Sequence, residues 1–179
     1  MYWDKKGSDC TADTVHLTLQ AAKEKNIKYI VVASNTGATA ELFANKGLEV
    51  VCVTHVNGFV NPGENEMSAE SRSSLEALNI KVLTTAHALS GAERAFSSKF
   101  GGIYPIEIVA NTLRMFGQGV KVGVEIATMA LDAGLIPFGE SIIAVGGSVR
   151  GADSAIILKP SHAKDILSTR IEEILCKPR

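Results

Sequence analysis

Five short runs of hydrophobic residues divide the chain, and each run is continuous rather than alternating with polar positions. The runs are rich in β-branched side chains and lie at residues 29–33, 50–54, 81–85, 142–145 and 155–158. A continuous apolar run of this length is typical of a strand that is buried on both faces of a sheet. The pattern therefore predicts five strands in the core of the molecule.

Segments with helical periodicity separate most of these strands. They are predicted at residues 11–26, 38–45, 68–78 and 161–175. Residues 105–134 are long enough for two helices, broken between Gly117 and Gly119. The alternation of strands and helices predicts an α/β layer fold with mostly parallel strands.

The connection between the last two strands sets their relative direction. Only residues 146–154 join them, whereas a parallel crossover takes about a dozen residues or more. We therefore expect the fifth strand to run antiparallel to the fourth. No repeat or linker interrupts the pattern, so residues 1–179 are predicted to form a single domain.

Composition and charge exclude several classes of protein. Hydrophobic residues make up 46% of the chain, charged residues 21%, and the net charge is -1. Because Lys and Arg are scattered singly, no nucleic acid partner is predicted. Residues 1–10 hold no apolar stretch, so we expect a cytoplasmic protein with no membrane partner. Cys10, Cys52 and Cys176 are odd in number and widely separated, which disfavours a disulfide framework or a zinc site. We expect Cys52 to belong to the core.

The loop after the first predicted strand is rich in hydroxyl and amide side chains. In a parallel sheet, ligands bind at the carboxyl ends of the strands, and this loop holds Ser34, Asn35, Thr36, Gly37 and Thr39. Backbone N–H groups at the start of a helix, together with hydroxyl donors, suit a phosphate. The alternative is that these residues only cap the helix that follows.

A second loop, after the fourth predicted strand, combines glycines with one arginine. It holds Gly146, Gly147, Arg150 and Gly151, and Asp153 follows. This composition suits a backbone that closes on an anionic ligand with Arg150 as its counter-charge. The alternative is a plain hairpin in which Arg150 pairs with Asp153.

Three further groups are weaker candidates for chemistry. His55, and His87 with Ser90, could act as acid–base groups, although no third member of a triad is evident. Glu125 and Asp132 lie seven positions apart on one helical face, which is compatible with metal ligation. Acidic residues beside an apolar stripe more often form salt bridges, here with Arg114 or Lys121, and no metal site is predicted.

The two loops resemble a known pattern. Residues 34–39 resemble the phosphate loop of the pyruvate kinase C-terminal domain, and residues 151–155 resemble the end of a hairpin in that domain. The chain as a whole, over residues 10–179, more closely resembles a family of small, mostly archaeal, stand-alone proteins with this α/β fold. The most specific stretches include residues 87–91, 132–137 and 146–153.

This resemblance implies a three-layer α/β/α sandwich with strand order 3-2-1-4-5 and an antiparallel fifth strand. Members of the family are associated with FMN. Carried over by motif position, the residues implied to hold the FMN phosphate are Ser34, Asn35, Thr36, Gly37 and Thr39. The residues implied to surround the ribityl chain and the ring are Thr54, His55, Gly91, Gly146, Gly147, Arg150 and Gly151.

The resemblance implies a protein that binds FMN or a related phosphorylated ligand, with a flavin-dependent oxidoreductase as the favoured enzyme class. The alternative is a sensor or regulatory module for a phosphorylated metabolite. Pyruvate kinase activity is not expected, because its barrel domain takes about 250 residues and the chain has 179. Self-association stays open, since no residue pattern specifies a symmetry.

Overall fold

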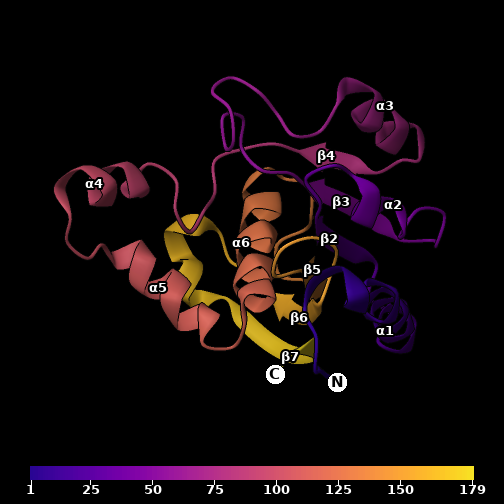
Figure 1. Cartoon of the computed structure of the whole chain (residues 1–179). Helices are drawn as coiled ribbons and strands as arrows, with labels where there is room; N and C mark the ends of the chain where they lie inside the picture. The colour runs from indigo at the N-terminus through magenta and orange to yellow at the C-terminus, as the bar shows by residue number, and fades with distance from the viewer.

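A mixed, seven-stranded sheet forms the centre of the molecule (Figure 1). The computed structural model describes all residues, Met1–Arg179. The strands are β1 (Tyr2–Trp3), β2 (Tyr29–Ala33), β3 (Glu49–Val53), β4 (Lys81–Leu83), β5 (Ile142–Gly146), β6 (Ser154–Lys159) and β7 (Arg170–Pro178). Their order is β1-β7-β6-β5-β2-β3-β4. The five predicted strands occupy β4-β3-β2-β5-β6 in the expected order, and β6 is antiparallel to β5 as expected.

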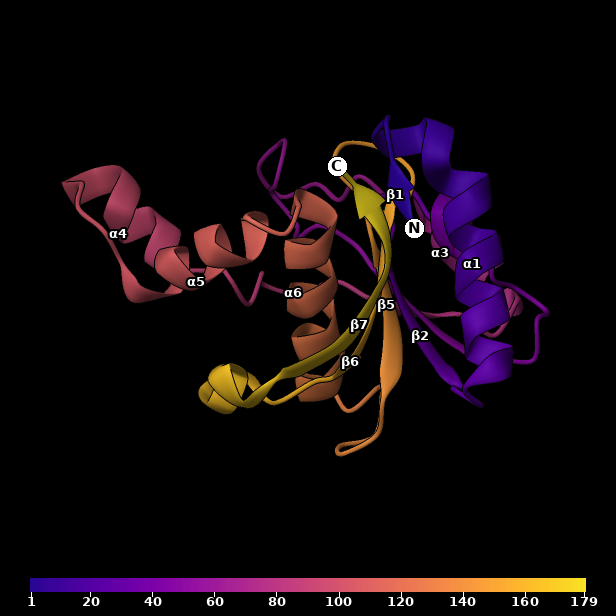
Figure 2. The ribbon, with the colours of Figure 1, turned by 90° about the horizontal axis from the view of Figure 1, so that it is seen from below.

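Helices cover both faces of the sheet (Figure 2). They are α1 (Thr11–Glu24), α2 (Ala38–Glu41), α3 (Ala69–Ala77), α4 (Glu93–Phe100), α5 (Pro105–Arg114) and α6 (Gln118–Asp132), with short 3-10 helices η1 (Gly7–Cys10) and η2 (Ala163–Ser168). Helix α6 packs on one face, while α1 and α3 lie on the other. Helices α4 and α5 extend away from the body beside α6. The arrangement confirms the predicted three-layer sandwich.

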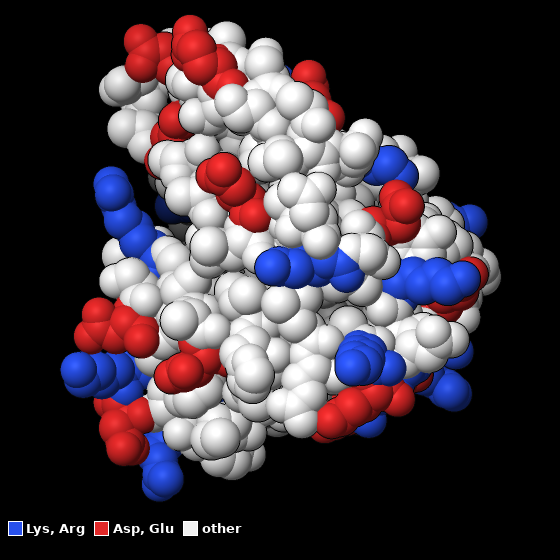
Figure 3. All heavy atoms as spheres, turned by 90° about the vertical axis from the view of Figure 1, so that its right-hand side faces the viewer, with Lys and Arg blue, Asp and Glu red and all other residues white.

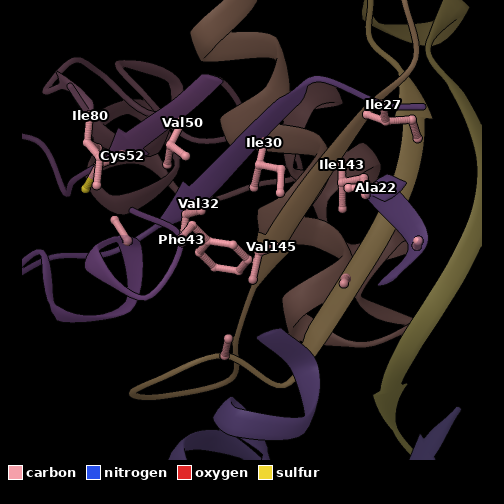
Figure 4. Packing of buried hydrophobic residues seen from close by; sticks show 14 of the residues in the cluster. Ala22, Ile27, Ile30, Val32, Phe43, Val50, Cys52, Ile80, Ile143 and Val145 are labelled. Atoms are coloured by element: carbon pink, nitrogen blue, oxygen red, sulfur yellow. The ribbon is translucent and has the colours of Figure 1, made fainter. Parts of the chain in front are cut away.

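Alternate residues of each central strand supply two separate cores. In β2, Ile30 and Val32 pack with Phe43 on the side of α1 and α2 (Figure 4), whereas Val31 packs against α6 on the other side. Both faces are covered, which explains why the strands read as continuous apolar runs. Cys52 is buried in the first core as predicted, and burial raises the pKa of its thiol to about 12.

The predicted helix at residues 161–175 is wrong. Only η2 is helical there, and β7 follows it and pairs antiparallel with β6. Two register shifts in this pairing add residues to β7, so that Ile171 lies opposite Leu158 and Ile174 lies opposite Ile156. Apolar residues three apart thereby reach one face of a strand, a spacing that otherwise indicates a helix. Pairing with β7 satisfies the backbone groups on the edge of β6.

The first ten residues also add to the sheet, although the sequence predicted no element there. Strand β1 pairs in parallel with β7, and the Trp3 indole Nε1 donates a 2.8 Å hydrogen bond to the carbonyl of Asp153. The expected five-stranded sheet is therefore a seven-stranded one. As a result, η1 lies beside the loop between β5 and β6.

Charged side chains of both signs are interspersed on the face that includes α1 and α3 (Figure 3). No single-sign patch covers that face. Among the helices, none combines the length and the apolar composition needed to span a membrane.

Candidate functional site

The carboxyl ends of β2 and β5 lie side by side, because these strands pair in parallel. The loops that follow them, residues 34–39 and 146–151, contribute to two sides of a cavity of about 670 Å³, which we call the cleft. Small-molecule sites typically have volumes of about 300–1,000 Å³. The cleft is lined by Ser8, Thr11, Ala33, Ser34, Asn35, Thr36, Ala38, Thr39, Leu42, His55, Glu66, Gln118, Val122, Gly147, Ser148, Val149, Arg150 and Gly151.

The loop after β2 is closed by its own serine. The Ser34 hydroxyl accepts a 3.2 Å hydrogen bond from the backbone N–H of Thr39, so Ser34 stabilises the turn, in line with the capping alternative. The side chains of Asn35 and Thr36 line the cleft and form no hydrogen bond within the protein. Their donors are therefore available to a ligand, whereas α2 spans only Ala38–Glu41 and offers a weak dipole.

Gly37 does not line the cleft. Its φ is +94°, and a Cβ added to it would lie 2.9 Å from Leu75 Cδ1 on α3. The glycine is therefore needed for a left-handed backbone and for close packing beneath the loop. Its role in the structure is conformational.

We expect Gly37→Ala to lower the free energy of unfolding by about 1–3 kcal/mol, because a non-glycine residue is strained at this φ and the methyl group meets Leu75. Urea unfolding is the measurement. Gly139→Ala is a control for φ, because Gly139 has φ +84° but a Cβ there meets no atom within 4 Å. A loss no larger than that of the control would show that Leu75 accommodates the methyl group.

The loop between β5 and β6 is held by a buried carboxylate. Asp153 is 0% exposed and accepts hydrogen bonds from the Gly7 N–H at 2.8 Å, the Ser148 N–H at 3.1 Å and the Ser154 hydroxyl at 2.8 Å. These donors compensate the burial of its charge. Arg150 forms no ion pair with Asp153, and its side chain has no hydrogen-bond partner in the chain. A free guanidinium group thus lines the cleft.

The three glycines of this loop lie at different places. Gly147 and Gly151 line the cleft, and Gly151, with φ +71°, packs tightly against Ser8 and Thr11. Gly146 does not line the cleft, because it lies against the backbone carbonyl of Gly119 in α6. A side chain at Gly146 would push α6 away from the strand end.

A smaller cavity of about 190 Å³ adjoins the cleft, and we call it the inner chamber. It is lined by Ala33, Asn35, Val53, Thr54, His55, Phe59, His87, Ser90, Arg94, Arg114, Gln118, Lys121, Val122, Glu125, Ile126 and Met129. Ala33, Asn35, His55, Gln118 and Val122 line both cavities. Thr54 lines only the inner chamber, where its hydroxyl lies 2.7 Å from that of Thr84.

Two histidines lie at the inner chamber. His55 Nδ1 lies 2.5 Å from Glu66 Oε2, and the two imidazole centroids of His55 and His87 are 5.5 Å apart. Glu66 thereby orients His55, whose other ring nitrogen can exchange a proton. Burial lowers the pKa of His87, so this imidazole is neutral near pH 7. Gly91 lines neither cavity; its φ is +40° and it lies against the His87 carbonyl.

The two acidic residues of α6 both bond to basic side chains. Glu125 Oε2 lies 2.5 Å from Lys121 Nζ, and both side chains are 7% exposed, in agreement with the predicted salt bridge. Asp132 pairs with His162 at 2.7 Å, a partner that sequence analysis did not name. No cluster of three metal-ligating side chains is present.

Several lining residues were missed because they come from distant parts of the chain. Ser8 and Thr11 reach the cleft through η1 and the start of α1, and Gln118 reaches it from the first turn of α6. Arg94 and Lys121 reach the inner chamber. None of these residues belongs to a local motif. Their place in the lining is evident only once the helices and strands are assembled in the fold.

One protein family and several solved structures match this chain. Residues 12–158 match the family described as "Pyruvate kinase, alpha/beta domain". A pyruvate kinase from Cryptosporidium parvum is 17% identical with a TM-score of 0.41; the match covers 81% of this chain and 22% of that one. The C. parvum enzyme solved in complex with ADP is 16% identical over the same shares, with a TM-score of 0.40. This chain therefore spans about a fifth of the length of those kinases. The match over residues 12–158 shows that the chain belongs to the pyruvate kinase alpha/beta domain family.

Proposed function

We propose that this chain binds FMN in the cleft. The phosphate would lie between the two loops, within reach of Asn35, Thr36 and Arg150, all of which line the cleft. The observation that carries the proposal is the free Arg150 guanidinium group. Asp153, the carboxylate nearest to it in sequence, is already engaged by three donors within the protein and does not pair with it. An unpaired arginine beside amide and hydroxyl donors favours an anionic ligand group.

The remaining lining suits the other parts of FMN. Small polar residues such as Ser8, Thr11 and Ser148 can hydrogen-bond a polyol chain, and the apolar side chains of Leu42 and Val122 can contact a planar ring. When bound, the flavin supplies electron or hydride transfer. The residues of the chain would bind and orient it. A flavin-dependent oxidoreductase is the enzyme class we favour, and the proposal assigns no phosphoryl transfer to this chain.

His55 is the residue of the cleft best suited to move a proton. Its ring is oriented by Glu66 and packs on Phe59 with a centroid distance of 3.8 Å. Because His55 lines both the cleft and the inner chamber, a proton held at its free nitrogen would be available to a ligand in either cavity.

We expect Arg150→Gln to weaken FMN binding at least tenfold, because a charge-assisted hydrogen bond contributes about 1.5–3 kcal/mol. Quenching of flavin fluorescence on titration with the protein measures the affinity. Arg170→Gln, which removes an exposed charge on β7 outside the cleft, is the matched control and should bind FMN as the parent chain does.

The same titration tests the proposal as a whole. A chain that fails to bind added FMN would contradict it. The alternative function, a sensor of phosphorylated metabolites, shares the phosphate end of the cleft but needs no flavin. It predicts that glucose 6-phosphate, and not FMN, raises the melting temperature, since only a ligand of the folded state stabilises it.

A further inference from the structure

The inner chamber carries an excess of positive charge. Arg94, Arg114 and Lys121 line it, with Glu125 as its one carboxylate. Glu125 is already engaged, because it accepts hydrogen bonds from Lys121 and from the Leu89 N–H at 2.9 Å. Two guanidinium groups therefore face the chamber without a carboxylate partner, in a chain whose net charge is -1.

The arginines and the lysine keep donors free. Arg94 forms no ion pair and no side-chain hydrogen bond. Arg114 bonds only to neutral amide oxygens, those of Gln118 at 3.0 Å and Asn111 at 2.8 Å. An ammonium group has three donors, and Lys121 gives one to Glu125. These three cationic side chains of the lining thus keep donors that no acceptor in the chain uses.

The volume and the apolar side chains of the inner chamber limit which ligands it can bind. The chamber has a volume of about 190 Å³, below the roughly 300–1,000 Å³ of typical small-molecule sites. Val53, Ile126 and Met129 add apolar side chains to the lining of the chamber. A small molecule with one anionic end and a short carbon chain matches this lining, whereas a nucleotide-sized ligand is too large for the volume.

We propose that the inner chamber is a second binding site, for a small carboxylic acid whose carboxylate is held by Arg94 and Lys121. The site is distinct from the cleft and does not depend on what the cleft binds. Because the two cavities share His55 and Gln118, the acid would lie next to a ligand in the cleft. Such an arrangement brings two small molecules together beside one histidine.

The pKa of His87 should change when an acid binds in the inner chamber. The groups that set its pKa are burial first, then Glu125, which raises it, and His55, Lys121 and Arg94, which lower it. A carboxylate bound between Arg94 and Lys121 offsets their positive charges. The pKa of His87 should therefore rise when the acid binds.

The experiment titrates the protein with propanoate and with its neutral isostere propanamide. Binding is measured by calorimetry, and the pKa of His87 is measured by NMR of its ring protons. Propanoate is expected to bind and to raise the pKa of His87, while propanamide does neither. Equal binding of the two compounds, or binding with no change at His87, would overturn the proposal.

Variants locate the site. Arg94→Gln is expected to weaken propanoate binding about tenfold, and Lys99→Gln, an equal loss of charge on the same helix α4 but outside the chamber, should leave it unchanged. Both residues are exposed, so both variants should fold. Loss of propanoate binding in Arg150→Gln but not in Arg94→Gln would place the acid in the cleft and refute the second site. FMN affinity, measured in parallel, tests the proposed function separately.

Discussion

Glu125→Ala is expected to lower the free energy of unfolding by about 3–5 kcal/mol. The substitution leaves the Lys121 ammonium buried without its partner, because that side chain is 7% exposed. It also removes the acceptor of the Leu89 N–H. An unpaired buried charge and an unsatisfied buried amide are both costly, because burial limits the hydration of each. Urea unfolding at neutral pH measures the loss.

Two further variants distinguish the effect of burying a charge from the effect of breaking an ion pair. Glu173→Ala breaks another Lys–Glu pair, with Lys25 at 2.9 Å, but those side chains are 47% and 45% exposed, so a change of less than about 1 kcal/mol is expected. The double variant Lys121→Met with Glu125→Leu removes both buried charges and should recover the part of the stability that Glu125→Ala loses through the unpaired ammonium, while the Leu89 N–H stays without its acceptor. If Glu125→Ala costs no more than Glu173→Ala, water reaches the buried pair and the argument fails.

Asp153→Ala is the second large effect we expect, with a loss of about 2–4 kcal/mol in the free energy of unfolding. Its carboxylate joins the Gly7 N–H and the Ser148 N–H, so it ties the N-terminal segment to the loop between β5 and β6. Without it, these donors lose their acceptor inside the fold. Because Arg150 belongs to the same loop, FMN affinity should fall as well. Urea unfolding and flavin fluorescence measure the two effects.

Asp153→Asn distinguishes the hydrogen bonds from the charge. Its amide oxygen can accept from both backbone N–H groups, and its amide nitrogen can donate to the Ser154 hydroxyl, which rotates to suit. We expect it to retain most of the stability. Asp4→Ala removes an exposed partner of Arg179 and should have little effect. A stable Asp153→Ala variant would contradict a structural role for this carboxylate.

The central sheet could be predicted because burial on both faces leaves a direct signature. The run at residues 29–33 matches β2 residue for residue, since a strand covered by helices on both sides needs apolar residues at every position. The antiparallel β6 could also be predicted, because residues 146–154 are too few for a crossover. Both inferences depend only on neighbouring residues.

The edge of the sheet could not be predicted in the same way. The spacing of Ile171 and Ile174 matches a helix, and it fits a strand only because β7 is bulged against β6. Strand β1 has two residues, too few for any pattern. Pairing between distant segments decides which strand covers the open edge of β6. The local sequence pattern does not indicate this pairing.

For the candidate site too, some features could be predicted from the sequence and others could not. By itself, the sequence determined the five strands β2 to β6 and the two polar loops at the carboxyl ends of β2 and β5, and the family resemblance added the order of these strands. Only the tertiary structure decided that Arg150 is free while Asp153 bonds to Gly7, that Gly37 packs under its loop, and that an inner chamber adjoins the cleft. The physical reason is that strand burial is a local property, whereas the partner of a charge and the walls of a cavity come from residues far apart in the chain.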